Sequence, residues 1–98
     1  MKVCTLQEAV SLIAPGSLIG FGGNTMHRVP VAAVRELIKQ KTPVKIIKSA
    51  GSLEVDALCA AGLAQEVHAA YVGYENFGLA RFFRQAIEQG HALLHEHT

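Results

Sequence analysis

The sequence predicts an α/β fold built on a mainly parallel sheet, and three observations favour that class. Short apolar segments alternate with amphipathic segments along the 98 residues, as in folds where strands and helices take turns. The apolar run 18–21 is not interrupted by polar residues, which is typical of a strand buried on both faces. Several strand patterns end in loops of small and polar residues, where α/β proteins place their ligands. These loops are 22–28, 49–53 and 73–78.

Two helices and two strands are predicted in the first half of the chain. Thr5 and Glu8 form a Thr-x-x-Glu capping box ahead of an apolar stripe at helical spacing, and Pro15 and Gly16 end that helix. Pro30 suits the first turn of the second helix. The predicted ranges are a helix over 5–13, a strand over 17–22, a helix over 30–40 and a strand over 44–48.

The second half repeats the alternation. Gly62 and Gly90 each follow a helical pattern and are expected to cap it. Phe77, Phe82 and Phe83 are expected to pack in the core. The predicted ranges are a helix over 54–61, a strand over 67–72, a helix over 79–89 and a strand over 91–97.

Length and composition limit the kind of protein. The 98 residues allow one domain, residues 1–98. Half of them are hydrophobic and the net charge is +1, which excludes disorder and gives no reason to expect nucleic acid or a membrane as a partner. No apolar run reaches the roughly 20 residues of a membrane span, and no signal peptide is recognisable. We therefore expect a cytoplasmic protein, with Cys4 and Cys59 as reduced thiols packed like small hydrophobic residues.

The glycine-rich loop after the first strand is the strongest candidate site. Gly22, Gly23 and Asn24 separate an apolar strand from the helix that begins at Pro30. Such a loop presents bare backbone N–H groups beside a helix N-terminus, where an oxyanion or phosphate is stabilised. The alternative is a tight turn that needs glycine for positive φ and binds nothing. The glycine-rich loop is not a complete dinucleotide fingerprint, because Thr25 stands where the third glycine belongs. It is not a P-loop either, because no Gly-Lys-Ser/Thr sequence follows.

Other polar residues near strand ends are candidate substrate contacts. Ser49 and Ser52 follow the second strand, and the alternative for Ser52 is a cap on the next helix. Glu75 and Asn76 follow the third strand, where a carboxylate suits a nucleophile or a general base. The loop residues 27–28, His and Arg, either contact an anion or are solvated.

The C-terminal histidines suggest a metal site only weakly. His91, His95 and His97 share one face of the predicted strand. His91 and His95 would lie about 13 Å apart, too far for one ion, which leaves the pair His95 and His97. We therefore predict an exposed polar face and no metal.

Two stretches resemble a known family. PGSLIGFGGNTMHRVPVAAVRELI (15–38) resembles the glycine-rich signature of the A-type subunits of family I coenzyme A transferases. AAYVGYENFGLARFFRQAIEQG (69–90) is similar to the corresponding stretch of glutaconate-type A subunits. Pro15, Asn24 and Arg28 depart from the signature, replacing an acid or Asn, a Phe and a Gly. The resemblance covers almost the whole chain, as the N-terminal part of one A-subunit domain.

The resemblance implies a fold and a reaction. The fold is a three-layer α/β/α sandwich with a mainly parallel sheet, here incomplete. The reaction moves coenzyme A from an acyl-CoA to a carboxylic acid through a glutamyl thioester on a B-type subunit. This chain should therefore lack the nucleophile, be inactive alone and work in a homo- or hetero-oligomer. The acyl-CoA is a substrate, and no permanently bound cofactor is expected.

The resemblance also implies site roles. The amides of Gly22 and Gly23 would act as oxyanion donors. With Asn24 in place of the usual aromatic residue, the acyl pocket would suit a polar acyl group. Glu75 is expected to brace the loop or orient substrate alongside Asn76. The predicted substrate contacts are Asn24, Thr25, Ser49, Ser52, Glu75 and Asn76.

Two other functions stay open from the residues. One is a sugar-phosphate isomerase-like enzyme on a similar scaffold, although the segment 22–25 is a thin match to a phosphate loop rich in Thr and Ser. The other is a small-ligand-binding module that keeps the pocket and has no catalytic activity.

Overall fold

The predicted alternation of strands and helices is present in the computed structural model, which describes residues 3–97. The main difference concerns the third predicted strand, 67–72. The strand begins at Ala64, because polar Gln65 and Glu66 interrupt the apolar pattern of its first half, and it ends at Ala69, while Tyr71–Val72 form a separate short strand. The elements are α1 (Leu6–Ser11), β1 (Ser17–Gly20), α2 (Val31–Lys39), β2 (Val44–Ile47), β3 (Ala50–Gly51), α3 (Leu53–Ala60), β4 (Ala64–Ala69), β5 (Tyr71–Val72), the 3-10 turn η1 (Glu75–Phe77), α4 (Arg81–Glu88) and β6 (Leu93–Glu96).

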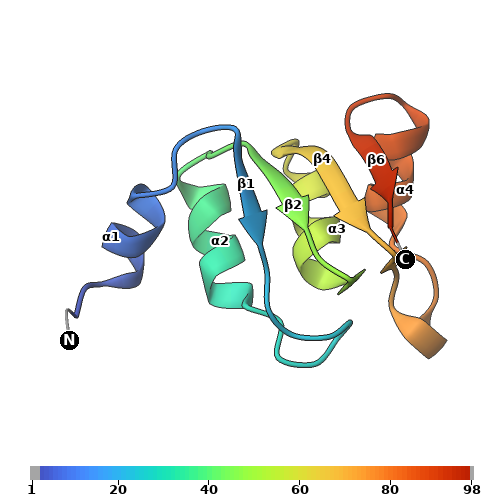
Figure 1. Ribbon diagram of the computed structural model, residues 1–98, viewed down its shortest axis with the longest axis horizontal. Coiled ribbons are helices and arrows are strands. Elements are labelled where there is room, and N and C mark those ends of the chain that lie inside the picture. Colours follow the sequence, from blue (N-terminus) through green and yellow to red (C-terminus); the bar gives the residue numbers. More distant parts are fainter. Residues whose placement is uncertain (1–2, 98) are drawn as a thin grey trace.

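The main sheet is parallel throughout and has the strand order β1-β2-β4-β6. Two short strands, β3 and β5, pair in parallel as a second small sheet. The four long strands point the same way, so that the loops after β1, β2 and β4 leave the same edge of the sheet (Figure 1).

The helices lie on one face of the sheet. Figure 1 shows α2, α3 and α4 behind the strands, with α1 at the β1 end. Each new strand is added on the same side of the previous one, and right-handed crossovers in a sheet that grows in one direction place their helices on one face. The α/β class with a mainly parallel sheet is thus confirmed, and residues 3–97 form two layers, the sheet and the helices on one of its faces.

The core forms between the sheet and these helices. Val44, Ile46 and Val67 point from the strands toward Leu37 and Leu58, and all five are buried. Burial of this apolar surface, worth about 25 cal/mol per Å², fixes the helices on the sheet.

Three predictions about apolar side chains need correction. Phe77 is 83% exposed on the turn η1, and Phe82 is 45% exposed where it lines a hollow with Cys59 and Ala60 of α3, so only Phe83 of the three packs against the core. Cys4 is exposed ahead of α1, whereas Cys59 is half-buried as expected.

The predicted helix ends are found. The Thr5 hydroxyl accepts a hydrogen bond from the Glu8 amide at 3.1 Å, and Gly62 and Gly90 have positive φ just after α3 and α4. Among residues 3–97, no helix has the length and apolar character needed to cross a membrane.

Candidate functional site

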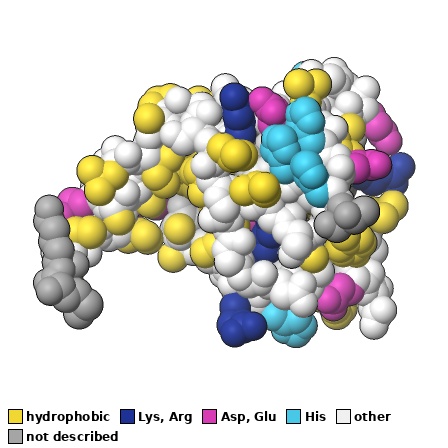
Figure 2. All heavy atoms as spheres, viewed as in Figure 1, with side chains coloured by type: hydrophobic (Ala, Val, Ile, Leu, Met, Phe, Trp, Pro, Cys, Tyr) yellow, Lys and Arg dark blue, Asp and Glu magenta, His cyan; other side chains and the backbone are white. Residues whose placement is uncertain are grey.

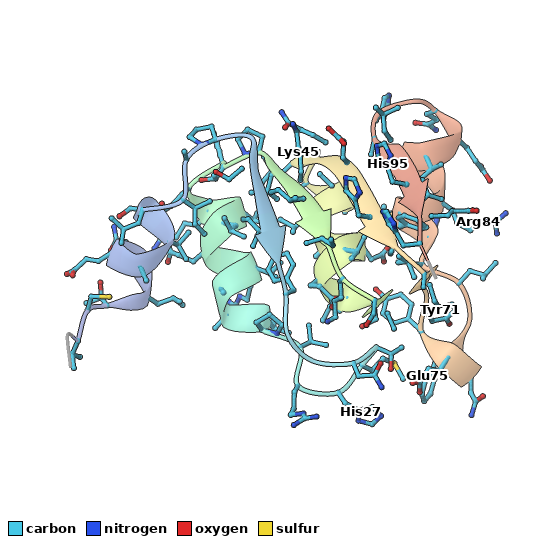
Figure 3. The ribbon with its side chains drawn as sticks, in the orientation of Figure 1. His27, Lys45, Tyr71, Glu75, Arg84 and His95 are labelled. Atoms are coloured by element: carbon cyan, nitrogen blue, oxygen red, sulfur yellow. The ribbon has the colours of Figure 1, made fainter. Side chains whose placement is uncertain are left out.

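Three loops meet at the edge of the sheet where the strands end. The Thr25 amide donates to the Ala50 carbonyl at 3.0 Å, which ties the glycine loop to β3. The hydroxyl of Ser52 donates to the carbonyl of Thr25 at 2.5 Å. Figure 3 shows the turn around His27 at this edge, with Tyr71 and Glu75 close to it. The predicted convergence of strand-end loops therefore brings together Thr25, Ser52 and Glu75.

Gly22 and Gly23 are both exposed, but they differ in backbone conformation and in the space available for a side chain. Gly23 has φ +89°, and a Cβ there would fall 2.7 Å from the His27 carbonyl oxygen and closer still to that of Arg28. Gly22 has ordinary φ, and a Cβ there would meet nothing within 4 Å. Neither amide donates a hydrogen bond to an acceptor in residues 3–97. Gly23 is thus required by the turn itself, whereas the space in front of Gly22 is open.

A tight turn follows the glycines. The Asn24 amide donates to the His27 carbonyl at 2.9 Å, and the His27 amide returns a bond of 2.8 Å. The Asn24 amide is therefore used within the turn, while its side chain is on the surface. Gly22 and Gly23 offer N–H groups without an acceptor among residues 3–97, as do Met26, Arg28 and Val29 in the same loop, and the two glycines have no side chain beside these groups.

Thr25 links this turn to η1. Its side chain is buried, and its hydroxyl oxygen lies 2.5 Å from Oε1 of Glu75 and 2.8 Å from the carbonyl oxygen of Asn24. The hydroxyl has one proton, so it donates to one of these acceptors at a time. The Glu75 amide in turn donates to the Tyr71 hydroxyl at 3.1 Å. This geometry fits the expected bracing role of Glu75.

A buried polar group supports the loop from below. The Ser52 amide donates to Oε1 of Glu54 at 3.0 Å, and the Lys48 ammonium lies 2.9 Å from the same oxygen. All three residues are buried. Ser52 makes no side-chain cap on α3, contrary to the alternative raised for it, because its hydroxyl is directed to Thr25.

A second buried carboxylate holds η1 and α4 against α3. Asp56 accepts from the Tyr74 hydroxyl at 2.8 Å and from the Phe83 amide at 2.9 Å. Desolvation, the hydrogen bond to Asp56 and the nearby carboxylates raise the pKa of Tyr74 well above its ordinary value. Lys48, Glu54 and Asp56 were not singled out from the sequence. A usable signal was the pair of acidic residues at 54 and 56 inside an otherwise apolar helix pattern.

Unfavourable backbone conformations gather at this edge. Thr25, Arg28 and Glu75 have φ of 45°, 57° and 55°, and Lys41 is the other non-glycine residue with positive φ in the described chain. Such conformations cost about 1–3 kcal/mol each and persist where surrounding contacts impose them. Here the contacts are the hydrogen bonds of Thr25 and Glu75.

Ser49 and Asn76 are placed apart from this group. Ser49 lines a separate hollow of about 210 Å³ together with His68 and His97. Asn76 is exposed on η1. Of the expected substrate contacts, Thr25 and Ser52 are buried, whereas Asn24, Ser49, Glu75 and Asn76 are exposed.

Comparisons with known proteins agree with this architecture. The coenzyme A transferase family model matches residues 3–94. The cholesterol ring-cleaving hydrolase IpdA subunit of Rhodococcus jostii (strain RHA1) is 32% identical over 82 residues, which are 84% of this chain and 27% of that protein.

Two solved structures are also similar. Glutaconate coenzyme A-transferase from Acidaminococcus fermentans has a TM-score of 0.92 and 27% identity, covering 100% of this chain and 32% of that chain. A variant of the decarboxylase AibA/AibB has a TM-score of 0.85 and 29% identity, covering 97% of this chain and 38% of that chain. The chain thus spans between about a quarter and two fifths of the length of these proteins.

Proposed function

Because the chain belongs to the coenzyme A transferase family, we propose that it forms part of an A-type half-site that moves coenzyme A from an acyl-CoA to a carboxylic acid. The observation that carries this proposal is the pair of exposed amides at Gly22 and Gly23, which have no acceptor among residues 3–97.

These amides suit the charge that develops when a thioester is attacked. A carboxylate that adds to the thioester carbonyl places negative charge on the carbonyl oxygen. N–H groups fixed beforehand stabilise that oxygen, and one donor contributes about 3–4 kcal/mol in known cases. The open space at Gly22 lets an acyl group approach the backbone, while the turn at Gly23 holds the amides in place.

The attacking carboxylate is proposed to come from a B-type partner chain, as a glutamate that carries the acyl group and then coenzyme A. The carboxylates that surround the glycine loop are already engaged. Glu75 accepts from Thr25, Glu54 is paired with Lys48, and Asp56 accepts from Tyr74. This supports a nucleophile from outside the described residues, and it implies that the chain is inactive alone.

The other predicted site residues divide into two roles. Asn24 and Asn76 are proposed to contact the acyl-CoA or the acceptor acid, because their side chains are exposed, the first after the two glycines and the second on η1. Thr25, Ser52 and Glu75 are proposed to act as positioning residues that hold the glycines through the hydrogen bonds described above. Ser49 would contact a substrate only if that substrate extended into the hollow that Ser49 lines with His68 and His97.

The test is an exchange assay with matched glycine variants. The chain is assayed alone and with a co-expressed B-type chain, and transfer of coenzyme A from an acyl-CoA to a free carboxylate is followed by chromatography. Gly22→Ala should lower kcat by about 10²–10³-fold, because its methyl group keeps the carbonyl oxygen from the amides. Gly20→Ala is the control, since its Cβ would lie 3.8 Å from Ile47 in ordinary contact. Exchange by the chain alone, or full activity of Gly22→Ala, would contradict the proposal.

A second candidate is hydrolysis or decarboxylation at the same loop. The relative from R. jostii is named a hydrolase and one similar structure is named a decarboxylase. Both reactions pass negative charge to an oxygen that free amides would stabilise. In the same assay, release of free coenzyme A without transfer would favour a hydrolase, and release of CO₂ would favour a decarboxylase.

A further inference from the structure

Four polar side chains gather on the face of the sheet that carries no helix from residues 3–97. In the register of the sheet, Glu66 and His68 are two positions apart on β4 and point to the same face, and His95 on β6 is paired with His68. His97 follows two residues later and completes the group. Figure 2 shows these histidines as one patch over β4 and β6, on the side of the sheet turned to the viewer.

The distances within this group are short. Oε1 of Glu66 lies 3.3 Å from Nε2 of His68 and 3.1 Å from Nε2 of His95. Nδ1 of His68 lies 3.1 Å from Nε2 of His97. One ligand atom from each of Glu66, His68 and His95 lies within 4.8 Å of the other two.

We propose that Glu66, His68 and His95 form a binding site for one divalent transition-metal ion, of which Zn²⁺ is the representative case. Two imidazoles and a carboxylate are ligands that such ions accept. Ligands about 2.0–2.1 Å from a tetrahedral ion lie roughly 3.3 Å from each other. The two contacts of Glu66 have this length, so little movement of the carboxylate is needed.

Two neighbouring side chains contact proposed ligands: Lys45 contacts Glu66, and His97 contacts His68. Lys45 lies 3.4 Å from Oε2 of Glu66, which leaves Oε1 for the ion. Nδ1 of His68 lies 3.1 Å from Nε2 of His97, so His97 could accept a hydrogen bond from Nδ1 once Nε2 of His68 gives up its proton to bind the ion.

Binding requires one change in the rings. His68 and His95 are stacked, with centroids 4.3 Å apart and an angle of 5° between their planes. Parallel rings do not both direct lone pairs at a point between them, so each must turn about χ2. Their side chains are 21% and 45% exposed, which leaves room for that rotation. Three protein ligands would leave a fourth position for water or another donor.

The sequence-based prediction of no metal considered only the histidines of the last strand. His91 was expected on the last strand, but β6 begins at Leu93, and His91 lies before it and lines another hollow with Cys59 and Phe82. His68 and Glu66 come from a different strand, and the parallel register of β4 and β6 places them beside His95.

The test uses the 98-residue chain without a histidine tag. Titration with Co²⁺ should give a saturable visible absorption band at one ion per chain, and Zn²⁺ should displace the Co²⁺. His68→Gln and His95→Gln should each weaken Zn²⁺ binding about tenfold or more. His91→Gln is the matched control and should bind as the unchanged chain does. Circular dichroism verifies that the variants are folded.

A second measurement needs no variant. In NMR spectra, diamagnetic Zn²⁺ should shift the ring signals of His68 and His95 and leave those of His27 and His91 unchanged. Absence of saturation at one ion per chain, or equal weakening by His91→Gln and His68→Gln, would overturn the proposal. Shifts at His27 or His91 equal to those at His68 would do the same.

Discussion

The hydroxyl oxygen of Thr25 lies 2.5 Å from Oε1 of Glu75, although the two residues are 50 positions apart in the chain. Both residues have positive φ, 45° and 55°, which side chains with a Cβ rarely adopt. The contact therefore joins two strained loops that follow different strands. Each loop depends on the other to keep its conformation, and the exposed glycines are next to this joint.

Replacing Thr25 by Val should weaken that joint. Val keeps the shape of the buried side chain and removes the donor, so the free energy of unfolding should fall by about 1 kcal/mol. Glu75→Gln keeps an acceptor oxygen and should cost less. The double variant should lose less than the sum of the two single losses, because Thr25→Val already removes the interaction that Glu75→Gln weakens. Urea unfolding of the four proteins measures this coupling, and strictly additive losses would show that the contact contributes nothing.

Gly23→Ala should destabilise the fold itself. Its Cβ would fall 2.7 Å from the His27 carbonyl oxygen, and its φ is +89°. We expect a loss of about 2 kcal/mol or more in the free energy of unfolding. Gly62→Ala is the control, because Gly62 also has positive φ but open space around it, and it should cost about 1 kcal/mol. Equal melting temperatures for the two variants would refute the role given to the turn.

Features that depend on neighbouring residues could be predicted from the sequence, whereas features that depend on contacts between distant segments could not. The alternation of the long strands with helices follows from patterns within a few residues, and this prediction is confirmed. The support beneath the loop was missed, because charged residues such as Lys48 and Glu54 are normally read as solvent-exposed. Their burial is visible only once β2 and α3 are packed together. The grouping of His68 with His95 likewise depends on the pairing of two strands.

Breaking the buried pair of Lys48 and Glu54 should be costly. Their side chains are 1% and 0% exposed, and the ammonium lies 2.9 Å from the carboxylate. Glu54→Gln would leave the Lys48 charge buried without its partner, which costs about 3–5 kcal/mol. The double variant with Lys48→Met should recover part of this loss, because neither residue then carries a charge.

The control for the buried pair is Lys45 on β2, three residues before Lys48. Lys45→Met removes an exposed partner of Glu66 and should cost less than about 1 kcal/mol. Chemical denaturation ranks the variants. If Glu54→Gln proved as mild as Lys45→Met, the pair would not support the loop as described.

The two cysteines should differ sharply in reactivity. Burial, followed by the charge of Asp56, raises the pKa of the Cys59 thiol from 9.0 to about 12. At pH 8 this lowers the reactive thiolate fraction about a thousandfold relative to an unshifted thiol. Iodoacetamide should therefore label exposed Cys4 first, and mass spectrometry of the folded chain should show one fast site.

The same shift makes stability depend on alkaline pH. Below pH 9.0 both the folded and the unfolded thiol of Cys59 keep their proton, so the shift has no effect. Between pH 9.0 and about 12 the unfolded thiol ionises while the folded one stays protonated, so the free energy of unfolding falls as the pH rises. Cys59→Ala should flatten this decline, whereas Cys4→Ala should leave it unchanged. A decline of the same slope in Cys59→Ala would mean that other groups, such as Tyr74, account for all of it.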